Sequence, residues 1–168
     1  MKSVLISIQP KWCELILKGK KTVEVRKTRP KLETPFKCYA YQTKGKEKLI
    51  DIIKDGDICY GEIYHGKPVF IKMREDSVYA GLFGRKQKVI GEFVCDTIVT
   101  DKTFGHDPLF NGAACMSEVE AAAYSCQSPI YGWHISNLVI YDKPKKLGEF
   151  GLTRPPRSWC YVEEGKSL

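Results

Sequence analysis

Short segments with β-strand character follow one another along most of this 168-residue chain, and only two helical patterns interrupt them. The first covers residues 11–18, where apolar residues recur three and four positions apart after Pro10, a residue suited to the first turn of a helix. The second begins at the capping-box sequence of residues 117–120 and continues to about residue 124. The even alternation of strands and helices that marks a doubly wound sheet is missing. We therefore expect an α+β fold, a mostly antiparallel or mixed β-barrel with a short N-terminal helix and one further helix after a central strand.

The expected strands cover residues 4–8, 22–28, 36–43, 89–100 and 130–141, the last being a strand pair or one bent strand. Residues 58–72 resemble a hairpin with its turn near His65 and Gly66. Residues 103–114 are rich in glycine, aspartate, proline and asparagine, which predicts a loop. We expect residues 1–168 to form a single domain, with an insertion into the barrel around residues 45–88.

Positive charge is concentrated in the first third of the chain. The formal net charge is +7, and residues 11–48 contain twelve Lys and Arg against four Asp and Glu, a local excess of eight. Residues 49–168 contain fourteen basic and sixteen acidic residues, so the excess does not extend beyond the first third. Charge concentrated in this way favours a polyanionic partner such as nucleic acid over a merely solvated basic face.

The seven cysteines are odd in number and form no CxxC pair, which favours reduced thiols in a cytoplasmic protein over a secreted disulfide framework. No apolar run approaches the roughly 20 residues that a membrane-spanning helix needs, and residues 1–8 resemble a first strand rather than a signal peptide. The spacing of cysteine and histidine fits no metal-ligand pattern. The sequence therefore predicts neither a metal site nor an organic cofactor.

One short segment, Gly19 to Arg26, joins the end of the first helix directly to a strand. Alternation along that strand places Glu24 and Arg26 on one face, and Lys21 lies in the turn before it. If this face borders a cleft, three charges of mixed sign converge there: the cations can hold phosphate, and the carboxylate can orient them or accept a proton. The alternative is a solvated strand face with an ordinary ion pair.

Residues 19–26 resemble the GxKxxExR motif of the ASCH domain family, whose members have a PUA-like β-barrel. The resemblance extends through residues 7–17, 38–41, 89–93, 131–133 and 154–161, and so covers most of the chain apart from roughly residues 45–88. It implies a basic cleft beneath the first helix that binds RNA or a nucleotide, in a regulatory or accessory role in RNA metabolism.

Some relatives of this family are enzymes, so the resemblance also implies a second interpretation, a hydrolase of RNA or of a modified nucleoside. The small members that hydrolyse N4-acetylcytidine use a lysine at the position of Lys21 and a threonine nucleophile at the position of Glu24. A carboxylate cannot simply replace a hydroxyl nucleophile that lysine activates. If the chain is an enzyme, Lys21 and Glu24 are its candidate catalytic residues. A third interpretation is a protein-interaction adaptor with a vestigial cleft.

Aromatic residues and the C-terminal segment add candidates for the same cleft. Tyr39 and Tyr41 share a strand face and can stack on bases, or they pack beneath the loop that follows their strand. Trp12 either lines the mouth of the cleft or anchors the first helix. Ser158 and Trp159 either close over the cleft or plug the end of the barrel. The candidate nucleotide-binding residues are therefore Lys21, Glu24, Arg26, Trp12, Tyr39, Tyr41, Ser158 and Trp159.

Overall fold

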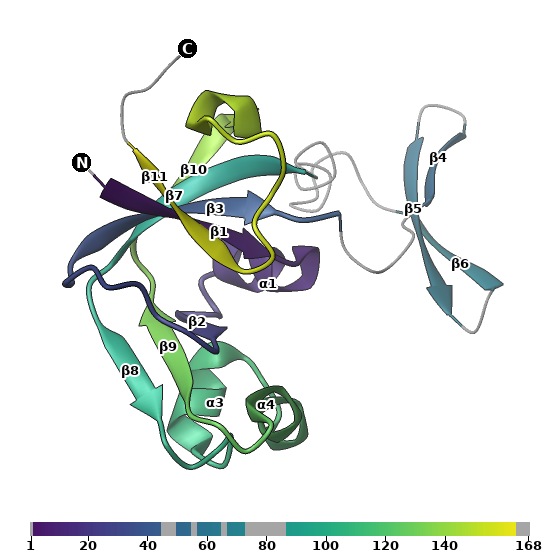
Figure 1. Ribbon diagram of the computed structural model, residues 1–168. Helices are drawn as coiled ribbons and strands as arrows, with labels where there is room; N and C mark the ends of the chain where they lie inside the picture. The colour runs from purple at the N-terminus through teal and green to yellow at the C-terminus, as the bar shows by residue number, and fades with distance from the viewer. Residues whose placement is uncertain (1, 45–49, 55–56, 65–66, 73–86, 164–168) are drawn as a thin grey trace.

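The computed structural model describes residues 2–44, 50–54, 57–64, 67–72 and 87–163. Its strands are β1 (Lys2–Ile8), β2 (Val23–Arg26), β3 (Phe36–Gln42), β4 (Ile50–Lys54), β5 (Asp57–Tyr64), β6 (Lys67–Lys72), β7 (Lys88–Cys95), β8 (Ile98–Asp101), β9 (Ile130–His134), β10 (Ser136–Lys145) and β11 (Trp159–Glu163). Its helices are α1 (Pro10–Leu17), α3 (Pro108–Ala114), α4 (Glu118–Ser125) and the 3-10 helix η1 (Leu147–Phe150) (Figure 1). None of the helices within these ranges is long and apolar enough to cross a membrane.

Two sheets enclose the main core. The larger sheet has the strand order β10-β7-β3-β1-β11 and is mixed, because β1 runs parallel to β3 and antiparallel to β11. The smaller sheet, β2-β9-β8, is antiparallel. Trp133 of β9 is fully buried, and its ring centroid lies 5.8 Å from that of Phe36 in the larger sheet. The expected α+β class and mixed pairing are confirmed, although the ladders of these eight strands form two separate sheets and do not join into a closed barrel.

The first helix and the turn after it agree with the sequence expectation. Pro10 occupies the first helical position, and Gly19 adopts a φ of +67°, a left-handed conformation that glycine tolerates without a steric penalty. The amide of Gly19 donates to the carbonyl of Ile16 at 2.9 Å, and the amide of Lys21 donates to the carbonyl of Leu15 at 3.0 Å. These bonds end the helix and direct the chain into β2, with only five residues between the two elements.

The prediction of a loop at residues 103–114 is wrong for its second half, because residues 108–114 form α3. The carboxylate of Asp107 accepts hydrogen bonds from the amides of Leu109 at 2.9 Å and Phe110 at 3.2 Å, and Pro108 takes the first helical position. Aspartate followed by proline is as typical of a helix start as of a loop. Composition alone did not distinguish the two, and α3 is therefore a helix that the sequence did not predict.

The strand expected at residues 89–100 is broken at residues 96–97, so β7 and β8 belong to different sheets. The imidazole of His134 lies 2.6 Å from the carboxylate of Asp96, and the amide of His134 donates to the carbonyl of Thr97 at 2.9 Å. The strand pair expected at residues 130–141 is confirmed as β9 and β10, which also belong to different sheets. Both segments therefore cross from one sheet to the other, as strands do at the corner of two packed sheets.

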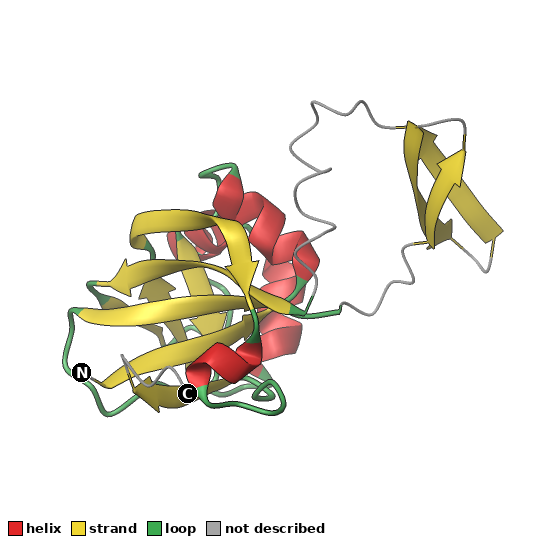
Figure 2. Ribbon diagram, turned by 90° about the horizontal axis from the view of Figure 1, so that it is seen from above, coloured by secondary structure: helices red, strands yellow, loops and turns green. Residues whose placement is uncertain are grey.

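The hairpin expected at residues 58–72 is confirmed as β5 and β6, which together with β4 form a third sheet. The turn expected at His65 and Gly66 lies outside the described residues. Figure 2 shows this sheet apart from the two main sheets. That residues 45–88 are an insertion stays a prediction.

The turn between β8 and α3 is organised by Asp101, which is only 3% exposed. Its carboxylate accepts hydrogen bonds from the amide of Thr103 at 2.7 Å, the hydroxyl of Thr103 at 2.6 Å and the amide of Gly105 at 2.8 Å. Burial alone would raise the pKa of Asp101, but these hydrogen bonds to the ionised form outweigh burial and lower the pKa below its ordinary value of 3.8.

We expect Asp101→Asn to lower the free energy of unfolding by about 1–3 kcal/mol at neutral pH, because two amides of the turn lose a charged acceptor. Since the folded-state pKa of Asp101 is depressed, its contribution is complete above 3.8 and is lost as the pH falls through the folded-state pKa. Urea unfolding of wild type and variant at about pH 7 and about pH 3 measures the difference. A difference that is equal at both pH values would contradict the assignment.

Candidate functional site

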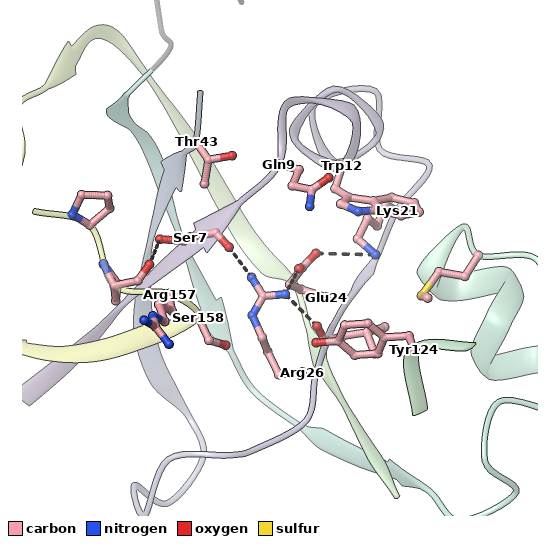
Figure 3. Close-up of a pocket in the computed structure, with 14 residues that line it drawn as sticks. Ser7, Gln9, Trp12, Lys21, Glu24, Arg26, Thr43, Tyr124, Arg157 and Ser158 are labelled. Carbon is pink, nitrogen blue, oxygen red and sulfur yellow. Dashed lines mark hydrogen bonds and ion pairs between the residues drawn. The ribbon is translucent and has the colours of Figure 1, made fainter. Parts of the chain in front are cut away.

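A cavity of about 390 Å³ lies beneath α1, between the two main sheets. Its walls come from six parts of the chain: the end of β1, α1 with the residue before it, the segment from Lys21 to Arg26, Thr43 directly after β3, the α3–α4 region through Met116 and Tyr124, and residues 155–158. Figure 3 shows these side chains around the cavity. Segments that are far apart in the sequence therefore have to come together before the cavity exists.

Lys21, Glu24 and Arg26 form the charged part of the cavity wall, and the structure brings all three together. They are only 3%, 3% and 8% exposed, which excludes the alternative of a solvated strand face. The valines that alternate with them in β2, Val23 and Val25, pack in a separate apolar cluster with Phe110 of α3. Strand β2 thus lies between an apolar layer and the cavity.

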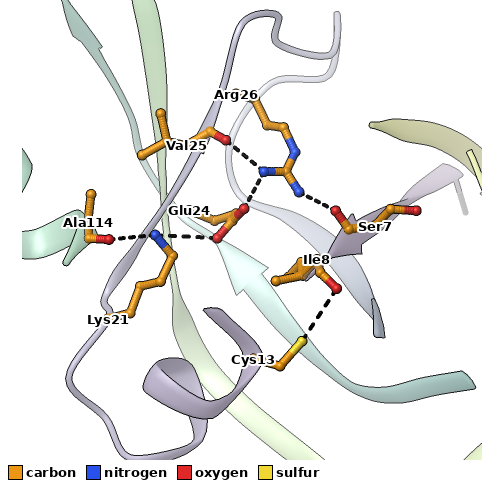
Figure 4. A network of polar contacts seen from close by, with 8 residues as sticks. All are labelled: Ser7, Ile8, Cys13, Lys21, Glu24, Val25, Arg26 and Ala114. Atoms are coloured by element: carbon orange, nitrogen blue, oxygen red, sulfur yellow. Dashed lines mark hydrogen bonds and ion pairs between the residues drawn. The ribbon is translucent and has the colours of Figure 1, made fainter. Parts of the chain in front are cut away.

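Glu24 links the two cations of this cluster. Its Oε1 accepts a hydrogen bond from Arg26 Nη1, and its Oε2 lies 3.5 Å from Lys21 Nζ (Figure 4). Oε2 is buried and accepts no hydrogen bond from any described residue. Lys21 Nζ also donates to the carbonyl of Ala114, at the end of α3, at 2.7 Å. Buried carboxylates are normally satisfied by hydrogen bonds, so Oε2 is an acceptor that a ligand in the cavity can use.

Arg26 joins β2 to β1 instead of presenting a free guanidinium to the cavity. Its Nη1 also donates to the carbonyl of Val25 at 2.7 Å, and its Nη2 donates to the carbonyl of Ser7 at 2.6 Å. Both terminal nitrogens are therefore engaged by protein oxygens. The phosphate contact that the sequence suggested for this residue is not favoured by its geometry, because both hydrogens of Nη1 are engaged and Nε, which lacks a hydrogen-bond partner among the described residues, is buried.

Burial lowers the pKa of the Lys21 ammonium below its ordinary value of 10.5, and the Glu24 carboxylate opposes part of that shift. With three formal charges the buried cluster carries a net charge of +1. Lys21 Nζ also lies 4.7 Å from the centroid of the Trp12 ring. Trp12 both lines the cavity and packs against the main core, so the two roles considered for it coexist.

Tyr39 and Tyr41 do not line the cavity. They are 8% and 2% exposed and belong to an apolar cluster that includes Leu5 and Val89. The ring of Phe150, from η1, covers Tyr39 at a centroid distance of 4.8 Å. They pack in the core and do not line the cavity for base stacking, but the observed cover of Tyr39 comes from η1, which the sequence did not predict, and not from the expected loop after their strand.

Ser158 and Trp159, the two candidates from the C-terminal segment, have different positions. Ser158 lines the cavity, whereas Trp159 packs its ring against Trp133 at 5.8 Å and Tyr161 at 5.4 Å. The indole of Trp159 donates to the hydroxyl of Thr28 at 3.0 Å. Trp159 is therefore part of the core packing, as its plug alternative proposed.

Several cavity residues were missed by sequence reasoning: Ser7, Gln9, Thr43, Met116, Tyr124 and Arg157. Ser7 had a readable signal, because it is a small polar residue in an otherwise apolar strand. Tyr124 and Met116 had none, since only the packing of α3 and α4 brings them to the cavity. Within the described ranges, no three residues of the kinds that ligate metals come together.

A family model described as ASCH domain matches residues 6–104. The chain is also similar to crystal structures of ASCH from Zymomonas mobilis. One has a TM-score of 0.63 and 17% identity, covering 96% of this chain and 88% of that chain. Two point mutants of that protein give TM-scores of 0.64 and 0.58 at 16% identity, covering 98% and 96% of this chain and 92% and 89% of theirs. No curated protein matches. These likenesses confirm the fold, in agreement with a PUA-like architecture.

Proposed function

This chain belongs to the ASCH domain family, and on that premise we propose that it is an RNA-binding domain whose cavity beneath α1 receives one nucleotide of a single strand. A buried carboxylate oxygen that lacks a hydrogen bond, 3.5 Å from a buried ammonium at the cavity wall, carries the proposal. These two groups are Glu24 Oε2 and Lys21 Nζ.

The size of the cavity suits a single nucleotide. A volume of about 390 Å³ falls in the lower part of the range of roughly 300–1,000 Å³ that is typical of small-molecule pockets. A duplex cannot enter a space of this size, whereas a base turned out of a single strand can. Proteins that read single-stranded RNA commonly bind splayed bases in this way.

The paired donor and acceptor favour a nucleobase edge over a phosphate. Lys21 Nζ donates and Glu24 Oε2 accepts, so together they match a ligand edge with an acceptor next to an N–H donor. Every common nucleobase carries such an edge. A base would supply the hydrogen bond that Oε2 lacks, whereas a phosphate would be repelled by the same carboxylate.

The surrounding charge supports a nucleic-acid partner. Residues 11–48 carry the local excess of eight positive charges, and they include α1 and β2 at the cavity. Lys11 and Lys27 from this range are exposed beside cavity-lining residues. Exposed cations of this kind attract a phosphate backbone without reading its sequence, and their contribution weakens as salt rises.

We expect Lys21→Met to weaken binding of a labelled single-stranded RNA about ten- to hundredfold, because a charged hydrogen-bond donor to the base is lost. The variant leaves the Glu24–Arg26 pair in place, so the net charge of the buried cluster changes from +1 to zero and no buried charge loses its partner. Fluorescence anisotropy at about 50 and 200 mM salt measures the change. The affinity should fall by a similar factor at both salt concentrations, because the phosphate contacts that determine the salt dependence are unchanged.

Lys102→Met is the matched control, because Lys102 is exposed and does not line the cavity. It removes the same charge from the chain as Lys21→Met does. Equal losses of affinity in the two variants would mean that only overall charge matters, and the cavity would not be the binding site.

One observation favours a second candidate, a hydrolase of RNA or of a modified nucleoside. Burial lowers the pKa of Lys21, which is typical of lysines that transfer protons in catalysis. Gel electrophoresis of the same RNA samples, together with an assay of acylated nucleosides, tests it. If the wild type forms product and Lys21→Met does not, the protein is an enzyme and the proposal of a binding domain is rejected.

A further inference from the structure

The outer wall of the cavity is an extended C-terminal segment that is fastened to β1. The amide of Ser7 donates to the carbonyl of Ser158 at 2.8 Å, and the hydroxyl of Ser7 donates to the carbonyl of Pro156 at 2.8 Å. The side chain of Trp159 extends this attachment to Thr28. Bonds on both sides of Arg157 therefore fix the backbone from which its side chain projects.

Arg157 differs from Arg26 in the two properties that matter for a ligand. It is exposed, whereas Arg26 is buried, and no carboxylate in the described part of the chain pairs with it. It nevertheless lines the same cavity. Figure 3 shows Arg157 and the Lys21–Glu24 pair on opposite sides of the cavity. The cavity therefore has a hydrogen-bonding edge on one side and an available guanidinium on the other.

We propose that Arg157 is the phosphate-binding residue of this site. A nucleotide whose base meets Lys21 and Glu24 has its phosphate at the rim, where the planar guanidinium donates two parallel hydrogen bonds to phosphate oxygens. The assignment rests on the proposed function and adds to it the group that recognises phosphate.

The rim is a better place for a phosphate than the interior of the cavity. Inside, the Glu24 carboxylate repels an anion, and the terminal nitrogens of Arg26 are already engaged. Moving a phosphate away from water also has a large desolvation cost. At the exposed Arg157 the phosphate keeps part of its hydration, and a strand can continue into solvent on either side of the bound nucleotide.

The segment itself is suited to hold the guanidinium in place. Pro155 and Pro156 precede Arg157, and their rings fix one backbone dihedral angle each. A backbone that is already restricted loses little conformational entropy when a ligand binds.

The test compares ligands that differ only by phosphate. Wild type, Arg157→Gln and Arg154→Gln are titrated with the common ribonucleosides, with their 5′-monophosphates and with a labelled single-stranded RNA of mixed sequence. We expect the wild type to bind a monophosphate about tenfold more tightly than its nucleoside, and Arg157→Gln to lose this preference while keeping the nucleoside affinity. Arg154 is an exposed arginine of the same segment that does not line the cavity, so its variant should retain the preference.

The outcomes distinguish the source of the phosphate and the two proposals. Loss of monophosphate preference in Arg157→Gln supports recognition of a terminal phosphate, and weaker RNA binding alone supports recognition of a phosphodiester within a strand. If nucleosides bind the wild type, but Arg157→Gln and Arg154→Gln have the same affinities for monophosphates and for RNA, the assignment of Arg157 is overturned and the proposed function stands. If no nucleoside, nucleotide or RNA binds the wild type, both are overturned.

Discussion

Glu24→Gln is expected to lower the free energy of unfolding by about 3–5 kcal/mol, because it leaves two buried cations without their shared counter-charge. Glutamine has nearly the shape of glutamate, so the packing around it is retained and the effect isolates the charge. Lys21 and Arg26, 3% and 8% exposed, would then repel each other in a medium that screens them poorly. Urea unfolding of the two proteins measures the difference.

A double-mutant cycle provides the control. Lys21→Met removes one of the two cations, so the combination of Glu24→Gln and Lys21→Met should be more stable than Glu24→Gln alone. Its coupling energy reports the Lys21–Glu24 interaction separately from the Arg26–Glu24 pair. A loss below about 1 kcal/mol in Glu24→Gln, the range of exposed ion pairs, would show that water screens this cluster.

Gly105→Ala is the second substitution with a large expected effect, a loss of about 2–6 kcal/mol in the free energy of unfolding, because two penalties add. Gly105 has a φ of +94°, a conformation that an L side chain rarely adopts. A Cβ there would lie 2.4 Å from backbone atoms of Ala121 and Ala122 in α4. Backbone atoms of a helix cannot move aside as the end of a flexible side chain can. Thermal or urea unfolding measures the loss, and wild-type stability would contradict the packing described here.

Gly112→Ala is its matched control. Gly112 lies within α3, and outside its chain neighbours and the backbone of its own helix no atom of the described residues lies within 4 Å of the Cβ that alanine would add. Alanine in a helix interior is favoured over glycine by up to about 1 kcal/mol, so this variant should be slightly more stable than the wild type. We also expect RNA affinity to fall in Gly105→Ala and not in Gly112→Ala, because displacement of α4 moves Tyr124 from the cavity wall.

The charged cluster was predictable from sequence because its geometry is local. A glycine that ends a helix and a strand period of two suffice to bring Lys21, Glu24 and Arg26 toward one region. The motif at residues 19–26 also predicted the family that the match over residues 6–104 establishes. The cluster and the motif each involve neighbouring residues only, whereas the wider resemblance to the family extends over most of the chain.

The surroundings of the cluster were not predictable, because they depend on contacts between distant segments. Arg26 is engaged through the carbonyl of Ser7, 19 positions away, and Tyr39 is covered by Phe150 of an unpredicted helix. Trp159 is partly buried and packs against Trp133 and Tyr161 instead of lining the cavity. A pattern of residue types indicates which face of a strand is special, but not which remote element covers it.

The attachment of residues 156–158 to Ser7 also determines when the cavity can form during synthesis. Strand β1 leaves the ribosome well before its partner β11 and the outer wall of the cavity, which are about 150 residues later in the chain. A ribosome-bound chain that ends before Ser158 already contains Lys21, Glu24 and Arg26, yet it has no wall to complete the cavity around them. Because chains are synthesised at roughly 5–20 residues per second, the basic segment at residues 11–48 has left the ribosome several seconds before the cavity is complete. The complete cavity therefore appears only after residues 155–158 have been synthesised, and it does not grow gradually with chain length.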